Sequence, residues 1–169
     1  VKMLKEFYNG FLTVSDNFIY SEIVTHGRDL FLDGYWQSEK YFKNNEIEIR
    51  NAFEIKEAIN YTVPNKSVSL HIRRGDYLNS NGYHPIQRME YYKKALDVVG
   101  DYDKLFILSD DIAWCKENVV FDNMVFVEGQ NETQDMKVMS LCDHNIIANS
   151  SFSWWGAWLN NNPNKIVIC

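Results

Sequence analysis

Two adjacent arginines, Arg73 and Arg74, stand in the stretch "VSLHIRRGDYL", where they end an apolar run at 68–72 and precede a glycine and Asp76. A guanidinium group is planar, stays charged and can donate two parallel hydrogen bonds to a phosphate or a carboxylate. Because side chains alternate along a strand, His71 and Arg73 should point to one face and Arg74 to the other. The stretch predicts an anion-binding loop at a strand end. A structural Arg–Asp pair is the alternative, and an "RGD" adhesion loop is disfavoured beside a buried strand.

Polar side chains also follow the next three apolar runs, which cover 105–108, 124–127 and 145–148. The segments after these runs read "SDD", "EGQNET" and "NSSFSWW". In an open parallel sheet the carboxyl ends of the strands lie at one edge, and ligands bind there. We therefore expect these segments and "RRGDY" to converge on one ligand site.

Serines and aspartates in two of these segments suit an anionic or base-containing ligand. Ser150 or Ser151 is a good N-cap, and the first backbone N–H groups of the following helix favour an anion such as phosphate. Phe152 and the tryptophans after it suit a core. Of Asp110 and Asp111, one should cap a helix, and the other could accept hydrogen bonds from a base such as guanine. With no third carboxylate or histidine close in sequence, the pair is a weak metal signal, and no metal site is predicted.

The elements that would position these residues are short apolar runs alternating with amphipathic segments. The runs cover 68–72, 105–108, 124–127, 145–148 and 166–169, and the helical patterns cover 85–100, 111–118, 132–143 and 150–161. Such alternation requires crossover connections, so the sequence predicts an α/β fold, a Rossmann-like parallel sheet with helices on both faces. A further helical pattern covers 38–62, and a boundary near Pro64 divides the chain into domains 1–65 and 66–169.

The composition excludes several classes of protein. The 169 residues are 46% hydrophobic, enough for a core, and the formal net charge of −6 argues against broad binding to nucleic acid or an anionic membrane. No apolar run approaches the ~20 residues that span a bilayer, and the first residues show no signal-peptide core. Three scattered cysteines predict free thiols in a reducing compartment.

Four segments together resemble one enzyme family. "HIRRGDY", "SDDIAW" and "NSSFSWWGAWL" are similar to motifs of the α-1,2-fucosyltransferases, glycosyltransferase family 11, and "DGYWQSEKYF" resembles the end of that family's first domain. The resemblance implies a two-domain GT-B architecture. Residues 1–65 would be the end of the acceptor-side domain with a linking helix, and residues 66–169 would be an incomplete donor-binding domain. The family's glycine-rich "GGLGNQMF"-like segment is absent, so we expect a fragment that binds GDP but is inactive alone.

The resemblance also implies a reaction. L-fucose would pass from GDP-β-L-fucose to the 2-hydroxyl of a terminal β-galactoside, with inversion at the fucose carbon and without a metal or other cofactor. Arg73 would be catalytic at the β-phosphate, Asp111 would contact the guanine, and Asp76 would be either a general base or a salt-bridge partner. The full set of expected donor-binding residues is His71, Arg73, Arg74, Asp111, Ser150, Ser151 and Phe152.

Two other interpretations stay open. Another GT-B nucleotide-sugar transferase, using UDP or GDP-mannose, would share the fold and the phosphate chemistry. A non-catalytic glycan-binding module would account for the aromatic content of 15%. We expect a bacterial cytoplasmic enzyme that builds a surface glycan, with a peripheral association with the inner membrane left open. The acceptor glycan and the oligomeric state are not predicted.

Overall fold

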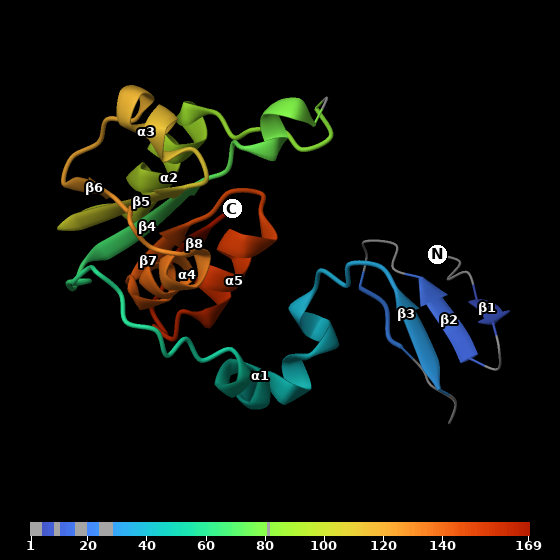
Figure 1. Cartoon of the computed structure of the whole chain (residues 1–169). Coiled ribbons are helices and arrows are strands. Elements are labelled where there is room, and N and C mark those ends of the chain that lie inside the picture. The colour runs from blue at the N-terminus through green and yellow to red at the C-terminus, as the bar shows by residue number, and fades with distance from the viewer. Residues whose placement is uncertain (1–4, 9–10, 16–19, 24–28, 81) are drawn as a thin grey trace. The chain divides into compact units, whose positions relative to one another are not determined.

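The computed structural model describes residues 5–8, 11–15, 20–23, 29–80 and 82–169. The chain divides into two compact units, residues 1–53 and 54–169 (Figure 1). This division comes earlier in the chain than the boundary expected near Pro64. Residues 54–65 therefore belong to the unit that carries the predicted site.

The first unit contains a small mixed sheet and a short helix. Its strands are β1 (Lys5–Tyr8), β2 (Phe11–Ser15) and β3 (Leu30–Asp33). β1 and β2 pair antiparallel, and β2 and β3 pair parallel. Its helical elements are the single 3-10 turns η1 (Glu39–Tyr41) and η2 (Lys43–Asn45) and the helix α1 (Glu46–Ala52).

The second unit is built on a five-stranded sheet with the order β6-β5-β4-β7-β8, in which every neighbouring pair is parallel. The strands are β4 (Ser67–Ile72), β5 (Lys104–Ser109), β6 (Met124–Phe126), β7 (His144–Ile146) and β8 (Val167–Ile168). Between them run η3 (Asp76–Asn79), α2 (Met89–Val99), α3 (Ile112–Asn118), α4 (Glu132–Leu141) and α5 (Ser151–Leu159). The predicted α/β fold with a parallel sheet is confirmed.

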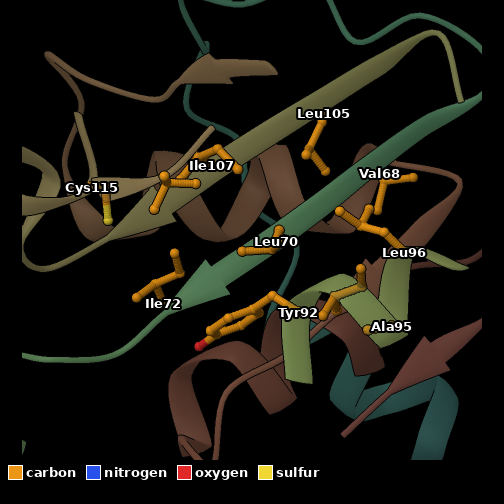
Figure 2. Close-up of a cluster of buried hydrophobic side chains, with 11 residues drawn as sticks. Val68, Leu70, Ile72, Tyr92, Ala95, Leu96, Leu105, Ile107 and Cys115 are labelled. Carbon is orange, nitrogen blue, oxygen red and sulfur yellow. The ribbon is translucent and has the colours of Figure 1, made fainter. Parts of the chain in front are cut away.

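Helices cover both faces of this sheet because each strand presents two alternating sets of side chains. On one face Val68, Leu70 and Ile72 of β4 lie in a buried cluster with side chains of α2 and α3 (Figure 2). On the other face Phe106 of β5 packs with side chains of α4 and α5. Burying one such apolar side chain stabilises the fold by roughly 1.5–3 kcal/mol. His71 lies on the α4–α5 face of β4, opposite the first cluster, as the alternation predicted.

A buried network of amides joins the sheet to α4 and α5. Asn145 of β7 donates through Nδ2 to Ser69 Oγ and to the carbonyl of Met139, each over 2.7 Å. Asn160, just beyond α5, donates to Asn145 Oδ1 over 2.8 Å and to the carbonyl of Cys142 over 2.7 Å. Buried amides are costly unless they are paired, so this network fixes where α5 sits on the sheet. It thereby positions the start of α5 at the carboxyl edge.

Of the helix predicted over 38–62, only Glu46–Ala52 is an α-helix, preceded by the 3-10 turns η1 and η2. α1 ends at Ala52, and residues 53–66 form turns and extended chain. Ile59, Tyr61 and Val63 pack against the α4–α5 side of the core, and this period of two is typical of an extended segment. The backbone N–H of Asn60 donates to the side chain of Gln130 over 2.7 Å. The backbone and side chains of this segment thus make contacts with residues distant in sequence, in place of the hydrogen bonds within a helix that the pattern predicted.

No helix in the described part of the chain is long and apolar enough to cross a membrane. Cys115 and Cys142 are buried, Cys169 is exposed, and all three thiols are free. Burial raises the pKa of the Cys142 thiol to about 12, so this thiol stays protonated at neutral pH.

Candidate functional site

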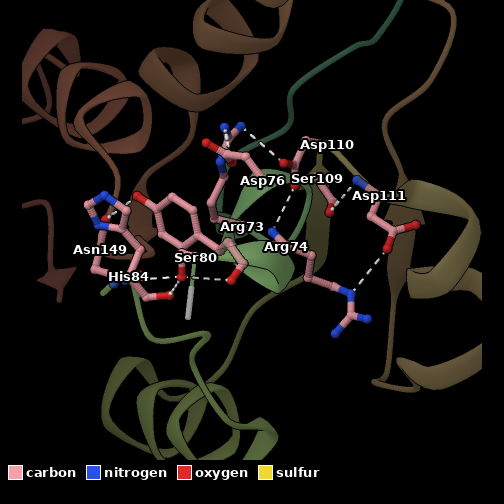
Figure 3. Close-up of polar contacts among 10 residues, drawn as sticks. Arg73, Arg74, Asp76, Ser80, His84, Ser109, Asp110, Asp111 and Asn149 are labelled. Atoms are coloured by element: carbon pink, nitrogen blue, oxygen red, sulfur yellow. Dashed lines mark hydrogen bonds and ion pairs between the residues drawn. The ribbon is translucent and has the colours of Figure 1, made fainter. Parts of the chain in front are cut away.

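The loops after β4, β5 and β7 meet at the carboxyl edge of the sheet, as predicted (Figure 3). Arg73 and Arg74 after β4 contact the two aspartates after β5. The phenol of Tyr77 in η3 donates to the carbonyl of Asn149 after β7 over 2.9 Å. The loop after β6 makes different contacts, since its Glu128 backbone N–H donates to the Tyr61 hydroxyl over 2.7 Å. Three of the four predicted segments are therefore joined by direct contacts.

Arg73 stands between two carboxylates at the end of β4. Its Nη2 lies 2.6 Å from Asp76 Oδ1, and its Nη1 lies 3.1 Å from Asp110 Oδ2. The guanidinium carbon also lies 5.4 Å from the centre of the Tyr77 ring. With 30% of its side chain exposed, Arg73 is held in place and still open to a ligand.

Arg74 points the other way and is built into the second unit. Its guanidinium lies 3.6 Å above the ring of Trp114, and its Nε donates to Asp111 Oδ2 over 3.1 Å. Only 14% of this side chain is exposed. A desolvated stack of this kind holds a guanidinium firmly. Arg74 therefore orients α3 against the loop, and a direct contact with the donor stays a prediction.

Gly75 is required by a close approach of the loop to Asp110. A Cβ on Gly75 would overlap the Asp110 carboxylate, so any larger residue would push the two apart. The same carboxylate accepts the backbone N–H of Arg74 through Oδ1 over 2.9 Å. Asp110 thus bonds the side chain of Arg73, bonds the backbone of Arg74 and packs on Gly75. The sequence interpretation assigned no such role to Asp110, although the doubled aspartate in "SDD" was its signal.

Asp111 is the aspartate that caps a helix. Its Oδ1 accepts the backbone N–H of Trp114 over 3.2 Å at the start of α3, while its Oδ2 is paired with Arg74. The sequence predicted that one aspartate of the pair would cap the helix and the other would contact the base, whereas the cap is Asp111, the residue that the resemblance assigns to guanine. The guanine contact itself stays a prediction. Each carboxylate oxygen of Asp111 keeps a second lone pair for a further donor.

His71 is buried at the carboxyl end of β4, with 3% of its surface exposed. Its ring lies 5.4 Å from the ring of Phe152 in α5. Nδ1 has no hydrogen-bond partner among the residues that the structure describes. Burial lowers the pKa of this imidazole to about 4, a nearby Asp110 opposes the shift, and Arg73 adds to it. His71 is therefore neutral at physiological pH.

The start of α5 carries Ser150, Ser151 and Phe152, the remaining predicted donor contacts. Ser150 is the N-cap residue, but its hydroxyl makes no capping hydrogen bond. Ser151 is exposed. The hydroxyl of Ser153, which was not predicted to matter, donates to the carbonyls of Ala148 and Ser150 over 3.2 Å each and so holds the turn. The helix start keeps N–H groups that the Ser150 hydroxyl does not cover.

Within the described ranges, no group of three or more histidine, cysteine, aspartate or glutamate side chains is arranged to hold a metal ion. The charged groups of the edge are instead paired with one another. Arg73 and Arg74 face Asp76, Asp110 and Asp111. The site is thus an arginine pair held by carboxylates, beside an uncapped helix start and a neutral histidine.

The sequence is similar to one family and to several named enzymes. The model described as Glycosyl transferase family 11 matches residues 4–169. An alpha-1,2-colitosyltransferase of Escherichia coli is 39% identical over 153 residues, which cover 80% of this chain and 53% of the relative. Galactoside alpha-(1,2)-fucosyltransferase 1 of Mus musculus is 28% identical over 167 residues, which cover 82% of this chain and 44% of the relative.

Among solved structures, a crystal structure of POFUT1 in complex with GDP is similar, with a TM-score of 0.47 and 12% identity. The similarity covers 73% of this chain and 45% of that chain. The chain spans about half the length of the curated relatives it matches.

Proposed function

The chain belongs to glycosyl transferase family 11, and from that premise we propose that the protein transfers L-fucose from GDP-β-L-fucose to the 2-hydroxyl of a terminal β-galactoside. Family membership confirms the resemblance drawn from the motifs and gives glycosyl transfer as the reaction class. The names of the two enzyme relatives support an α-1,2 linkage. The donor, the acceptor, inversion and independence from metal are parts of the proposal.

The observation that carries the donor assignment is the placement of Arg73. When the sugar–phosphate bond breaks, negative charge develops on the β-phosphate, and donors fixed beside that charge lower the barrier. Arg73 is a fixed and accessible cation at the edge where ligands of parallel sheets bind. In the proposal it supplies the charge that a metal ion would otherwise supply. The uncovered N–H groups at the start of α5, with Ser150 and Ser151, would hold the same diphosphate from the β7 side.

The remaining donor contacts follow from the same placement. His71, which is neutral and lies behind Arg73 on the same face, would offer its imidazole to the nucleotide. Phe152 would line the fucose end. Asp111 would accept the N1–H and N2–H₂ groups of guanine with the lone pairs that its bonds to α3 and Arg74 leave. Arg74 would serve the donor by keeping Asp111 in position.

The acceptor step in the proposal is a single displacement. The acceptor hydroxyl attacks the fucose carbon from the face opposite GDP, through an oxocarbenium-like transition state, and its proton passes to a general base. Asp76 is the carboxylate of the site with the most exposed side chain, at 67%, and is the candidate for that base. Normal turnover of Asp76→Asn would exclude this role.

A second candidate function is favoured by the colitosyltransferase relative. Colitose is L-fucose without its 3-hydroxyl, so the same phosphate site would serve a GDP sugar of either kind. The two candidates differ in whether the protein offers a partner to the 3-hydroxyl, and they share every role assigned above to the diphosphate.

The experiment that tests the proposal is a transfer assay on the full-length protein in EDTA. GDP-fucose and GDP-colitose are compared as donors to a β-galactoside, and the product linkage is read by NMR. Transfer of fucose to the 2-hydroxyl, inhibited by GDP and not by UDP, is expected. A higher kcat/KM with GDP-colitose would select the second candidate. Transfer from a UDP sugar alone, or loss of all transfer in EDTA, would contradict the proposal.

The cellular location also belongs to the proposal. We expect the enzyme in the bacterial cytoplasm, where GDP sugars are made, in the synthesis of a surface glycan. Fractionation of the native host, with the enzyme followed by antibody, tests this expectation. Recovery outside the cytoplasm and the inner-membrane fraction would contradict it.

A further inference from the structure

The two carboxylates on Arg73 are held in different ways. Asp110 lies at the end of β5, accepts the backbone N–H of Arg74 over 2.9 Å and packs on Gly75. Its side chain is 23% exposed. Asp76 starts the short turn η3, pairs with Arg73 across 2.6 Å and is largely exposed. Asp110 is therefore part of a fixed frame, whereas the contact of Asp76 can be broken without disturbing a strand.

Together these carboxylates occupy both terminal nitrogens of Arg73, Asp76 on Nη2 and Asp110 on Nη1. The two terminal nitrogens form one of the forks through which a guanidinium grips a phosphate. A diphosphate that approaches this fork meets two carboxylates of its own sign. Each terminal nitrogen has two N–H groups, so the carboxylates leave donors free, but their negative charge opposes the approach, and a close bidentate contact is favoured when one of them leaves.

We propose that Asp76 is an internal competitor for the diphosphate: it occupies Arg73 in the unliganded protein and leaves when the diphosphate binds, while Asp110 positions Arg73 in both states. The inference rests on the proposed function for its ligand. The exposed pair is the one that yields, because exposed ion pairs contribute little stability and long side chains regain freedom when such a pair opens. The displaced carboxylate of Asp76 is then unpaired.

The exchange conserves charge pairing at Arg73. Before binding, Arg73 faces Asp76 and Asp110, and the neighbouring Arg74 faces Asp111, so the edge has two cations and three anions. After binding, the phosphate takes the place of Asp76. The two aspartates should therefore have opposite effects on affinity. Removing the charge of Asp76 removes a competitor, whereas removing that of Asp110 releases the arginine.

The test measures the affinity of the full-length protein for GDP by calorimetric titration in EDTA. Asp76→Asn is expected to tighten binding about three- to fivefold, the range expected for an exposed ion pair. Asp110→Asn is expected to weaken it. Asp97→Asn, on the exposed side of α2, makes the same change in net charge away from the site and should leave the affinity as it was.

Two further probes separate this inference from the proposed function. Inorganic pyrophosphate carries the diphosphate without the base and should respond to Asp76→Asn as GDP does, whereas guanosine, which lacks phosphate, should not respond. If folded wild-type protein binds pyrophosphate but not GDP, the donor assignment fails and the competitor role is still read from pyrophosphate. If Asp76→Asn weakens binding, or changes it no more than Asp97→Asn does, the competitor role is overturned while GDP binding stands. If neither GDP nor pyrophosphate binds to the folded wild-type protein, both proposals fall.

Discussion

The loop after β4 (residues 73–76, the arginine loop) and the loop after β7 (residues 149–151, the serine loop) face the same edge and are built in opposite ways. In the arginine loop each cation is met by a carboxylate of the protein itself. In the serine loop Ser150 makes no capping bond, and the start of α5 is left open. A change in the arginine loop therefore disturbs partners on a second strand. Loss of the Ser150 hydroxyl should be felt mainly by the ligand.

The largest expected effect concerns Arg73 in the arginine loop. Arg73→Ala should lower kcat of the full-length enzyme about 100- to 1,000-fold, the cost of losing one donor to a developing oxyanion. Arg73→Lys should recover little, because an ammonium lacks the planar fork. Steady-state kinetics measures both, with exposed Arg88→Ala at the start of α2 as the control. A kcat of Arg73→Ala within tenfold of wild type would contradict a role of Arg73 in stabilising the transition state.

The next effect concerns His71, which joins the two regions because it lies near the end of β4 and contacts Phe152 of α5. Its pKa is about 4 in the folded protein, below its ordinary value of 6.5, because burial disfavours the charged form. The unfolded chain therefore takes up a proton below pH 6.5 that the folded chain refuses until about pH 4. The free energy of unfolding should fall across this window as the pH drops, by about 3 kcal/mol in total.

Urea unfolding between pH 7 and pH 4.5 measures this contribution. His71→Gln should flatten the pH dependence relative to wild type, whereas exposed His84→Gln should keep the wild-type slope. An unchanged slope in His71→Gln would show that His71 is not held neutral by burial.

Gly75 tests the claim that the arginine loop is tied to β5. Gly75→Ala should destabilise the protein by about 1–3 kcal/mol, because the new methyl group overlaps the Asp110 carboxylate. In the double variant Gly75→Ala, Asp110→Ala the overlap is gone. The double variant should therefore lose less stability than the sum of the losses of the two single variants. Denaturant unfolding of the four proteins measures the coupling. Strict additivity would contradict the tie between this glycine and Asp110.

The smallest effect compares two helix starts. Asn131 caps α4 with a complete capping box, so Asn131→Ala should cost about 1 kcal/mol of stability. Ser150→Ala should change stability by less than about 0.5 kcal/mol, because its hydroxyl caps nothing, yet should weaken donor binding about fivefold through one lost hydrogen bond. Thermal unfolding and GDP titration check the pair. A loss of stability in Ser150→Ala equal to that in Asn131→Ala would erase the contrast between the loops.

Two patterns in the sequence predicted much of this architecture: the alternation of side chains along a strand, and the alternation of strands with helices along the chain. The alternation predicted the face of His71, which lies opposite Val68, Leu70 and Ile72, and the polar segments after β4, β5 and β7 meet as expected. The role of Asp110 was missed because it depends on the register between β4 and β5. Ile72 pairs with Ser109, and that pairing brings together the residues that follow, Arg73 and Asp110. Sequence periodicity gives the face of a side chain but not its neighbour on another strand.

The error over 53–62 has the same origin. The apolar residues of that segment fit a helix as well as an extended chain, and local propensity did not decide between them. Tyr61 decides it, since its hydroxyl meets the backbone of Glu128 and its ring packs on Phe106. Contacts so distant in sequence are not encoded in any local pattern.

The measurement that tests the central claim most directly is a calorimetric titration of the full-length protein with GDP in EDTA, for wild type, Arg73→Ala and the control Arg88→Ala. We predict that wild type and Arg88→Ala bind GDP with the same affinity in the absence of metal, and that Arg73→Ala loses measurable binding while its circular dichroism stays native. Equal GDP affinity in Arg73→Ala and wild type, or a folded wild-type protein that does not bind GDP, would contradict the assignment of the arginine loop to the donor diphosphate.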